Sequence, residues 1–227
     1  MPVLELIIAA VMFIAVILYA LLGGADFGGG MWDLLAFGRR ARQQREAIAV
    51  AIAPVWEANH VWLILVIVLL FTAFPPAFAV IMTALNIPMT IILVGIVLRG
   101  AVFMFRKHDV QNDAIHRRWS TVFGISSVFV PLFLGITLGA LATGDIRVEE
   151  GMVVSGFFTG WTSPFAIACG FFAQGLFAFL AATYLTVDAK EQPHRRRKGR
   201  RQHDGIRRDD GAKAVDQCGD DLGSGGP

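Results

Sequence analysis

Long runs of apolar residues, separated by short polar segments, dominate the first 187 residues of the chain. Each run is long enough to cross a hydrocarbon core of roughly 30 Å as a helix. The pattern therefore predicts an all-α integral membrane protein, a bundle of about five transmembrane helices formed by residues 1–187. The five expected spans cover residues 4–22, 48–74, 77–105, 121–142 and 153–187.

Within the third span, Asn86 and Pro88 predict a kink, because proline removes a backbone hydrogen bond.

Basic residues occupy alternate connections between these runs. They cluster at 39–45 and at 106–118, and again after the last run, whereas the connections near 75–76 and 144–150 are nearly free of them. Cytoplasmic loops carry the excess of Lys and Arg, so the N-terminus is expected outside and the basic loops inside. The low charged content, 17% against 55% hydrophobic residues, agrees with a membrane protein.

Residues 188–227 have a different character from the rest of the chain. They are rich in Arg, Asp and Gly and show no apolar periodicity, which predicts a basic, disordered cytoplasmic tail. Its positive charge suits contact with anionic membrane lipid, and no nucleic-acid partner is expected. The abrupt change also fits a frame-shifted end, and the sequence leaves both interpretations open.

Charged side chains within the spans are the candidate functional residues. Asp26 lies at the end of the first run, Glu57 inside the second and Arg99 inside the third, all toward the cytoplasmic side. An unpaired charge at such depth costs at least about 2–3 kcal/mol. We therefore expect a buried cluster in which Arg99 faces one or both carboxylates.

His60 follows Glu57 by three residues, so the two share one face of a helix. Together with Asp26 they would form a proton path from the cytoplasm; the alternative is a set of static polar contacts between helices. Asn59 points to another side and is predicted to be a helix contact.

Cofactor ligands are sparse in this sequence. Haem needs axial His, Met or Cys side chains, and His60 is the one histidine within the apolar runs. The two cysteines, Cys169 and Cys218, show no zinc-binding spacing. We expect no metal site and no haem bound directly by this chain.

Several motifs resemble those of subunit II of the cytochrome bd quinol oxidases. They are APVWEANHVWLI around Glu57, GGADFGGGMWDLL around Asp26, LRGAVFMFR around Arg99, and the later SSVFVPLFLGITLGAL and ATYL. The resemblance covers about residues 4–187 and none of the tail.

The resemblance implies a terminal oxidase of the bacterial inner membrane that oxidises quinol and reduces oxygen to water. Haem b and haem d, or haem b alone, would belong to the partner subunit I, and a bound quinone is a further candidate. Glu57 matches an acidic residue on a cytoplasmic proton path, Trp62 a residue near a proposed oxygen route, and Asp26 the acid of the first motif.

Two departures from the family pattern stand out. The motif often carries a second acidic residue where Gly23 stands here. The family has about eight helices, so five helices indicate a chain truncated after the fifth. Activity of this chain alone is not expected.

Two other functions remain as alternatives. One is a proton-coupled transporter, although no internal repeat supports it. The other is a structural fragment that does not assemble.

Overall fold

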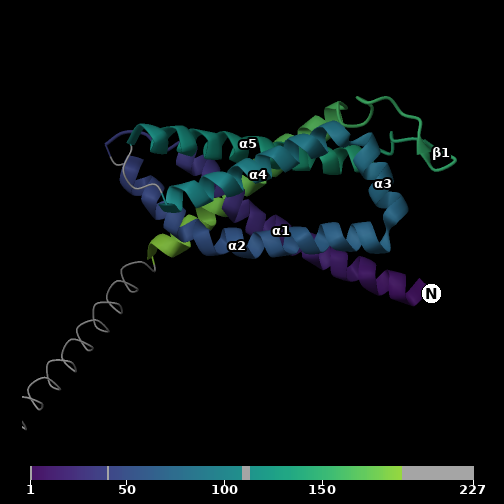
Figure 1. Ribbon diagram of the computed structural model, residues 1–227, viewed down its shortest axis with the longest axis horizontal. Helices are drawn as coiled ribbons and strands as arrows, with labels where there is room; N and C mark the ends of the chain where they lie inside the picture. Colours follow the sequence, from purple (N-terminus) through teal and green to yellow (C-terminus); the bar gives the residue numbers. More distant parts are fainter. Residues whose placement is uncertain (1, 40, 109–112, 191–227) are drawn as a thin grey trace, which may run out of the picture. The chain divides into compact units, whose positions relative to one another are not determined.

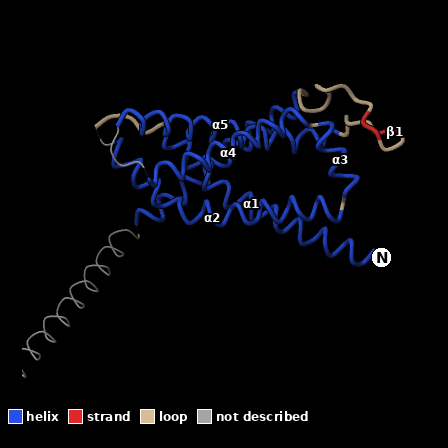
Figure 2. The backbone as a smooth tube through the Cα atoms, in the orientation of Figure 1, coloured by secondary structure: helices blue, strands red, loops and turns tan. Residues whose placement is uncertain are grey.

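Helices form almost all of the structure, a computed structural model that describes residues 2–39, 41–108 and 113–190. In chain order the helices are α1 (Pro2–Leu34), α2 (Ala41–Ala73), α3 (Pro75–Ala84), α4 (Asn86–His108) and α5 (Asp113–Thr143). A further helix covers Pro164–Lys190. Figure 1 and Figure 2 show the long helices running side by side, with α3 crossing one end between α2 and α4.

The helices have the length and composition of membrane spans. Among the described residues, four helices are individually long and apolar enough to cross a membrane, and a fifth span results if the bent pair α3–α4 counts as one. The predicted all-α membrane fold is therefore confirmed. Residues up to Leu185 form one compact unit. The predicted tail lies outside the described residues from 191 onward.

The helix boundaries differ from several of the predicted ranges. Helix α2 begins at Ala41 instead of residue 48, and α5 at Asp113 instead of residue 121. Helix α1 continues to Leu34 instead of ending at residue 22, because its glycines lie where neighbouring helices approach closely. The third range is two helices with a bend of 92° between them, which confirms the predicted kink near Asn86. The last helix begins at Pro164, not at residue 153.

The connection before that last helix is a small hairpin and a series of turns. Strand β1 (Val148–Glu149) pairs antiparallel with β2 (Met152–Val153). The turn needs two residues with positive φ, which Glu150 and Gly151 adopt at 50° and 80°. This segment takes the first eleven residues of the predicted fifth range out of the helix.

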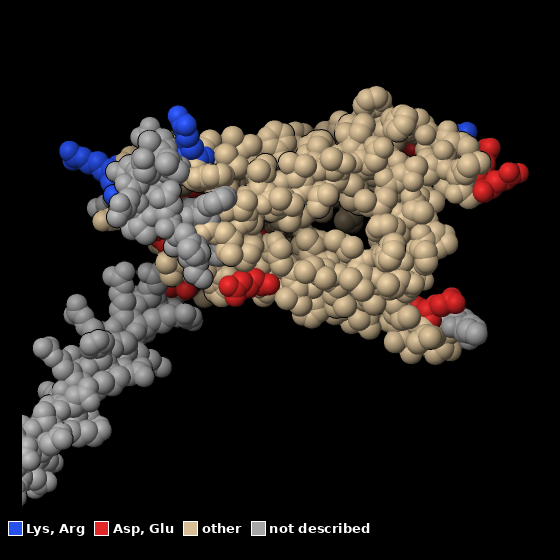
Figure 3. Space-filling model, viewed as in Figure 1, with Lys and Arg blue, Asp and Glu red and all other residues tan. Residues whose placement is uncertain are grey.

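Packing centres on contacts of α1 with α2 and α5, and of α4 with α5. The apolar core there is formed by Tyr19, Phe27, Met31, Ile92, Val130 and Phe177, with Trp62 packed against it. In Figure 3 most of the visible basic side chains lie at one end of the helical body, where α2 and α5 begin. This charge distribution agrees with the topology that the basic loops predict.

Candidate functional site

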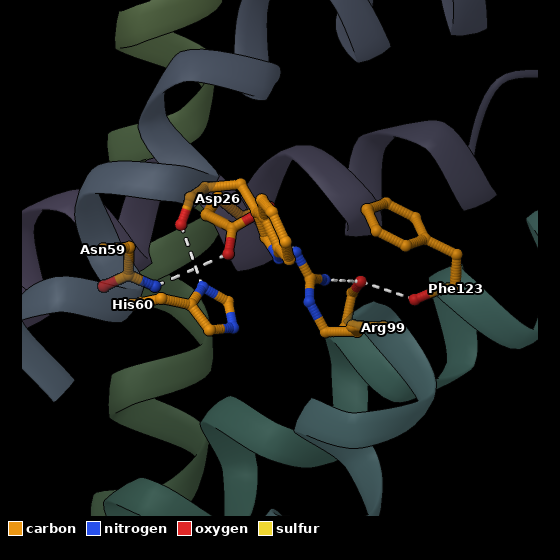
Figure 4. Close-up of polar contacts among 7 residues, drawn as sticks. Asp26, Asn59, His60, Arg99 and Phe123 are labelled. Atoms are coloured by element: carbon orange, nitrogen blue, oxygen red, sulfur yellow. Dashed lines mark hydrogen bonds and ion pairs between the residues drawn. The ribbon is translucent and has the colours of Figure 1, made fainter. Parts of the chain in front are cut away.

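A cluster of buried polar side chains lies where α1, α2 and α4 meet. Asp26 comes from α1, Asn59 from α2 and Arg99 from α4, and each is at most 1% exposed. Figure 4 shows the three side chains directed toward one another from their separate helices. The packing of these three helices brings the side chains together, although they are far apart in sequence.

An ion pair between Arg99 and Asp26 forms the centre of this cluster. The Nη2 atom of Arg99 lies 2.5 Å from Oδ1 of Asp26, and it also donates to the Asp26 carbonyl at 3.3 Å. Both side chains are at most 1% exposed, so the two opposite charges neutralise each other in surroundings that would strongly disfavour either alone.

The remaining contacts of Arg99 come from α5 and from aromatic rings. Its Nη1 donates to the hydroxyl of Ser127, which itself donates to the carbonyl of Phe123 at 2.5 Å. The rings of Phe27 and Phe123 each lie 4.4 Å from the guanidinium carbon. Cation–π attraction from both rings therefore holds the guanidinium in place.

Asn59 and His60 extend the cluster along α2. The Asn59 amide donates to Oδ2 of Asp26 over a long 3.5 Å, so the predicted helix contact of Asn59 reaches the buried acid. His60 is half-buried; its Nδ1 lies 2.9 Å from the Trp56 carbonyl, and the two rings are 4.6 Å apart.

Glu57 lies outside this cluster. Its side chain is exposed on the outer face of α2, whereas Asn59 is directed inward. The structure thus brings Arg99 to Asp26 and not to Glu57. Trp62 is half-buried against the apolar core.

Several site residues escaped the sequence interpretation. Ser127, Phe27 and Phe123 surround Arg99, but serine and phenylalanine in a span carry no signal that distinguishes a charge partner from packing. Asp33 is 1% exposed and lies seven residues, about two turns, after Asp26. That spacing was a usable signal, since it places both carboxylates on the same side of α1.

The described side chains offer few ligands for a metal ion or a haem. Within the described ranges, no three His, Cys, Asp or Glu side chains are grouped so as to hold a metal ion. His60 is one of seven side chains from α1, α2 and α4 that line a narrow, partly open hollow. That space is far too small for a porphyrin, so these residues do not fit a haem.

Comparison with known proteins decides the family. The family described as "Cytochrome bd terminal oxidase subunit II" matches residues 4–204. The chain belongs to this family. The match continues past residue 187, so the expectation that the resemblance excludes the whole tail was wrong for residues 188–204.

Curated relatives are similar over most of this chain and about half of their own length. Cytochrome bd-I ubiquinol oxidase subunit 2 of Escherichia coli (strain K12) is 29% identical over 181 residues, 78% of this chain and 47% of the relative. A putative cytochrome bd menaquinol oxidase subunit II of Bacillus subtilis (strain 168) is 27% identical, covering 79% and 52%. The chain therefore spans about half the length of these relatives.

The fold has a counterpart among solved structures. The bd oxidase from Geobacillus thermodenitrificans matches with a TM-score of 0.68 at 22% identity, over 81% of this chain and 55% of the solved one. At this identity the similarity concerns the fold alone.

Proposed function

We propose that this chain is the haem-free subunit II of a bd-type respiratory quinol oxidase in the bacterial inner membrane. In this role it supports the haem-bearing subunit I and contributes a proton path from the cytoplasm for the reduction of oxygen to water. The observation that carries the proposal is the family match over residues 4–204, which includes every residue of the buried cluster.

Haem is assigned to the partner subunit because the described donors here do not fit it. Bound in subunit I, haem b and haem d, or haem b alone, would supply the electron transfer from quinol to oxygen. The residues of this chain would then act on protons and on assembly, and no redox step falls to them.

The outer face of α2 is the surface we assign to subunit I. Glu57, Val61, Ile64 and Val68 recur at spacings of four, three and four residues, and all are exposed. Apolar side chains alone could face lipid, but a carboxylate at membrane depth costs several kcal/mol against acyl chains. A partner helix with a donor or basic group at the depth of Glu57 removes that cost.

The proposed proton path begins at this interface and leads inward. Glu57 receives protons at the partner-facing surface, His60 lies three residues further along α2, and Asp26 lies buried beside Asn59. Arg99 fixes the Asp26 carboxylate by their ion pair. Trp62, which packs beside this region, is our candidate for lining an oxygen route.

Gly23 lies beside the same group of residues. A Cβ at Gly23 would meet the Asn59 amide oxygen at 3.4 Å, an ordinary contact. The second acid that resembling motifs carry at this position would thus begin next to Asn59. In this chain Asn59 faces that space without it, so the proposed path relies on fewer carboxylates.

A tagged pulldown from native membranes tests the proposal. We expect the eluate to contain a second, haem-bearing polypeptide and a reduced-minus-oxidised optical spectrum with haem bands. A chain bearing the same tag but with Glu57→Lys is the matched control, because a misplaced positive charge on the proposed contact face should weaken capture. Recovery of intact chain without haem would refute the oxidase assignment.

A further inference from the structure

The segment between α5 and the helix Pro164–Lys190 divides into a charged part and an uncharged part. Its charged residues all lie at 145–150, in the hairpin and the residues just before it. From residue 151 to residue 187 the chain carries no Asp, Glu, Lys or Arg. By composition, the turns at residues 156–163, which we name the aromatic turn, therefore belong with the membrane-spanning helix that follows and not with the hairpin.

Two phenylalanines give the aromatic turn a large apolar surface. Phe157 and Phe158 are consecutive in the chain and 67% and 63% exposed. The Phe158 ring lies 5.7 Å from the ring of Trp161, which is half-buried and packs on the apolar cluster that contains Ala140. An exposed aromatic surface of this kind marks contact with a membrane or with another protein.

The backbone beneath these two phenylalanines is hydrogen-bonded by side chains of the turn itself. The Phe157 carbonyl accepts from Nε1 of Trp161 at 2.8 Å, and the Phe158 carbonyl accepts from the Thr162 hydroxyl at 2.6 Å. In water such carbonyls need no protein donor, because solvent supplies one. In hydrocarbon no solvent donor exists, so backbone groups must be satisfied internally. The bonding of the two carbonyls therefore favours lipid over water as the surroundings of the turn.

Contacts with α5 place the aromatic turn level with the last turn of that helix. Gly160 is buried, and a Cβ there would lie 3.8 Å from the carbonyl oxygen of Ala140. Its φ of 87° favours glycine and lets the chain fold back beside α5. Ala140 precedes the helix end at Thr143 by three residues, about 4.5 Å along the axis. Figure 2 shows this loop in tan beside β1, at the end of the helical body that α3 crosses.

We propose that the aromatic turn inserts into the lipid leaflet opposite the basic loops and anchors the start of the last helix. Phe157 and Phe158 lie at the boundary between phospholipid headgroups and acyl chains, where exposed aromatic side chains of membrane proteins gather. The charged hairpin stays in water. The inference uses only the sequence and contacts of α5 and the segment after it, so it stands or falls independently of the oxidase assignment.

Spin-label accessibility tests the insertion on the full chain, purified with any bound partner and reconstituted in vesicles of phosphatidylcholine and phosphatidylglycerol. The nitroxide is attached to Phe157→Cys, in a chain that also carries Cys169→Ala and Cys218→Ala. The matched control is a label on Glu149→Cys, which is also exposed but belongs to the charged hairpin. Oxygen concentrates in lipid and a nickel chelate stays in water, so their collision rates with the label identify the surrounding medium.

The three possible surroundings of the turn give three different results. We expect the label at position 157 to collide several-fold more with oxygen than with the nickel chelate, and the label at position 149 to show the reverse. A preference for the nickel chelate at both positions would overturn the inference, because the turn would then lie in water. Slow collision with both reagents at position 157 would overturn it in favour of a covering protein.

The variant Thr162→Val provides a second measurement, with Thr162→Ser as its control. Valine keeps the shape of threonine but removes the donor to the Phe158 carbonyl, whereas serine keeps the hydroxyl. In lipid the freed carbonyl draws the turn toward water, so nickel collisions at position 157 should rise several-fold with Thr162→Val and not with Thr162→Ser. Equal collision rates in the two variants would contradict the insertion, because the carbonyl would then have no need of an internal donor.

Discussion

Neutralising one member of the Arg99–Asp26 pair should destabilise the protein far more than neutralising both. The single variants are Asp26→Asn and Arg99→Met, and the double variant carries both substitutions. Each single variant leaves one formal charge buried, with Asp26 and Arg99 at 0% and 1% exposure in the native chain. The double variant loses the attraction but leaves no charge behind.

The expected magnitudes follow from the contacts. Removing one partner of a buried pair costs about 3–5 kcal/mol, because the other charge stays without compensation. Replacing both partners by neutral groups is often close to neutral. In Arg99→Met the new thioether still lies near the rings of Phe27 and Phe123, where sulfur–aromatic contacts of about 0.3–1.5 kcal/mol replace part of the cation–π attraction. The double variant should therefore recover most of the loss.

Two measurements test this prediction. Tryptophan fluorescence follows the thermal unfolding of each purified variant, and the amount of each variant in the membrane is measured alongside. A cost of 3–5 kcal/mol corresponds to a change on the order of a hundred- to a few thousand-fold in the folding equilibrium. Both singles should accumulate poorly, and the double should approach the native chain. A double variant that is as unstable as the sum of the singles would refute the reasoning, since the cost would then not come from an orphaned charge.

Three further variants test separate parts of the structure. Gly135→Ala should lower the free energy of unfolding by about 1–3 kcal/mol, because the new Cβ would lie 2.6 Å from the Cys169 carbonyl oxygen. The control Gly175→Ala places its Cβ in open space and should stabilise the helix slightly. Equal melting temperatures for the two variants would contradict this packing. Glu57→Gln should slow oxygen consumption by roughly 10²-fold or more in an assembled complex. The control Glu46→Gln, which removes a charge from an exposed ion pair, should leave the rate unchanged. Unchanged oxygen consumption with Glu57→Gln would refute the proton path and leave static polar contacts between helices as the role of these residues. Ser127→Ala removes one acceptor of Arg99 and should lower stability by about 1–3 kcal/mol; an unchanged melting temperature would show that this bond contributes nothing.

The depth of a residue in the membrane could be predicted from the sequence, but the side of the helix that faces the other helices was harder to predict. Distance from the basic loops placed Asp26, Glu57 and Arg99 in one leaflet, and Asp26 and Arg99 are indeed in contact. Glu57 and Asn59 differ by two residues and so point about 160° apart, at roughly 100° per residue. Only one of the two can face the centre, and charge alone suggested Glu57 where the fold uses Asn59.

Helix ends were misjudged where local signals and tertiary contacts disagree. Glycines after residue 22 favour a helix end when taken alone. In α1 they persist within the helix because Gly24 and Gly28 lie against Leu180 and Ala181 of a segment far along the chain. At residues 153–163, by contrast, an apolar stretch was read as helix although its glycines and turns keep it irregular.

Because of Gly24 and Gly28, the first helix to be synthesised completes its packing only after the last described helix has been made. Helix α1 leaves the ribosome first, yet Gly24 and Gly28 find their neighbours only in the helix Pro164–Lys190, which is made last of those described. Until that helix is made, the glycine-rich part of α1 near Asp26 lacks its packing partner and is a less stable helix. Arg99, which pairs with Asp26, is also synthesised after α1. We expect α1 to stay accessible in arrested nascent chains that stop before Pro164 and to become protected once that helix has entered the membrane. Accessibility of a cysteine at position 31, where Met31 is 6% exposed and contacts Gln174 of the last helix, would show when the first helix to be made completes its fold.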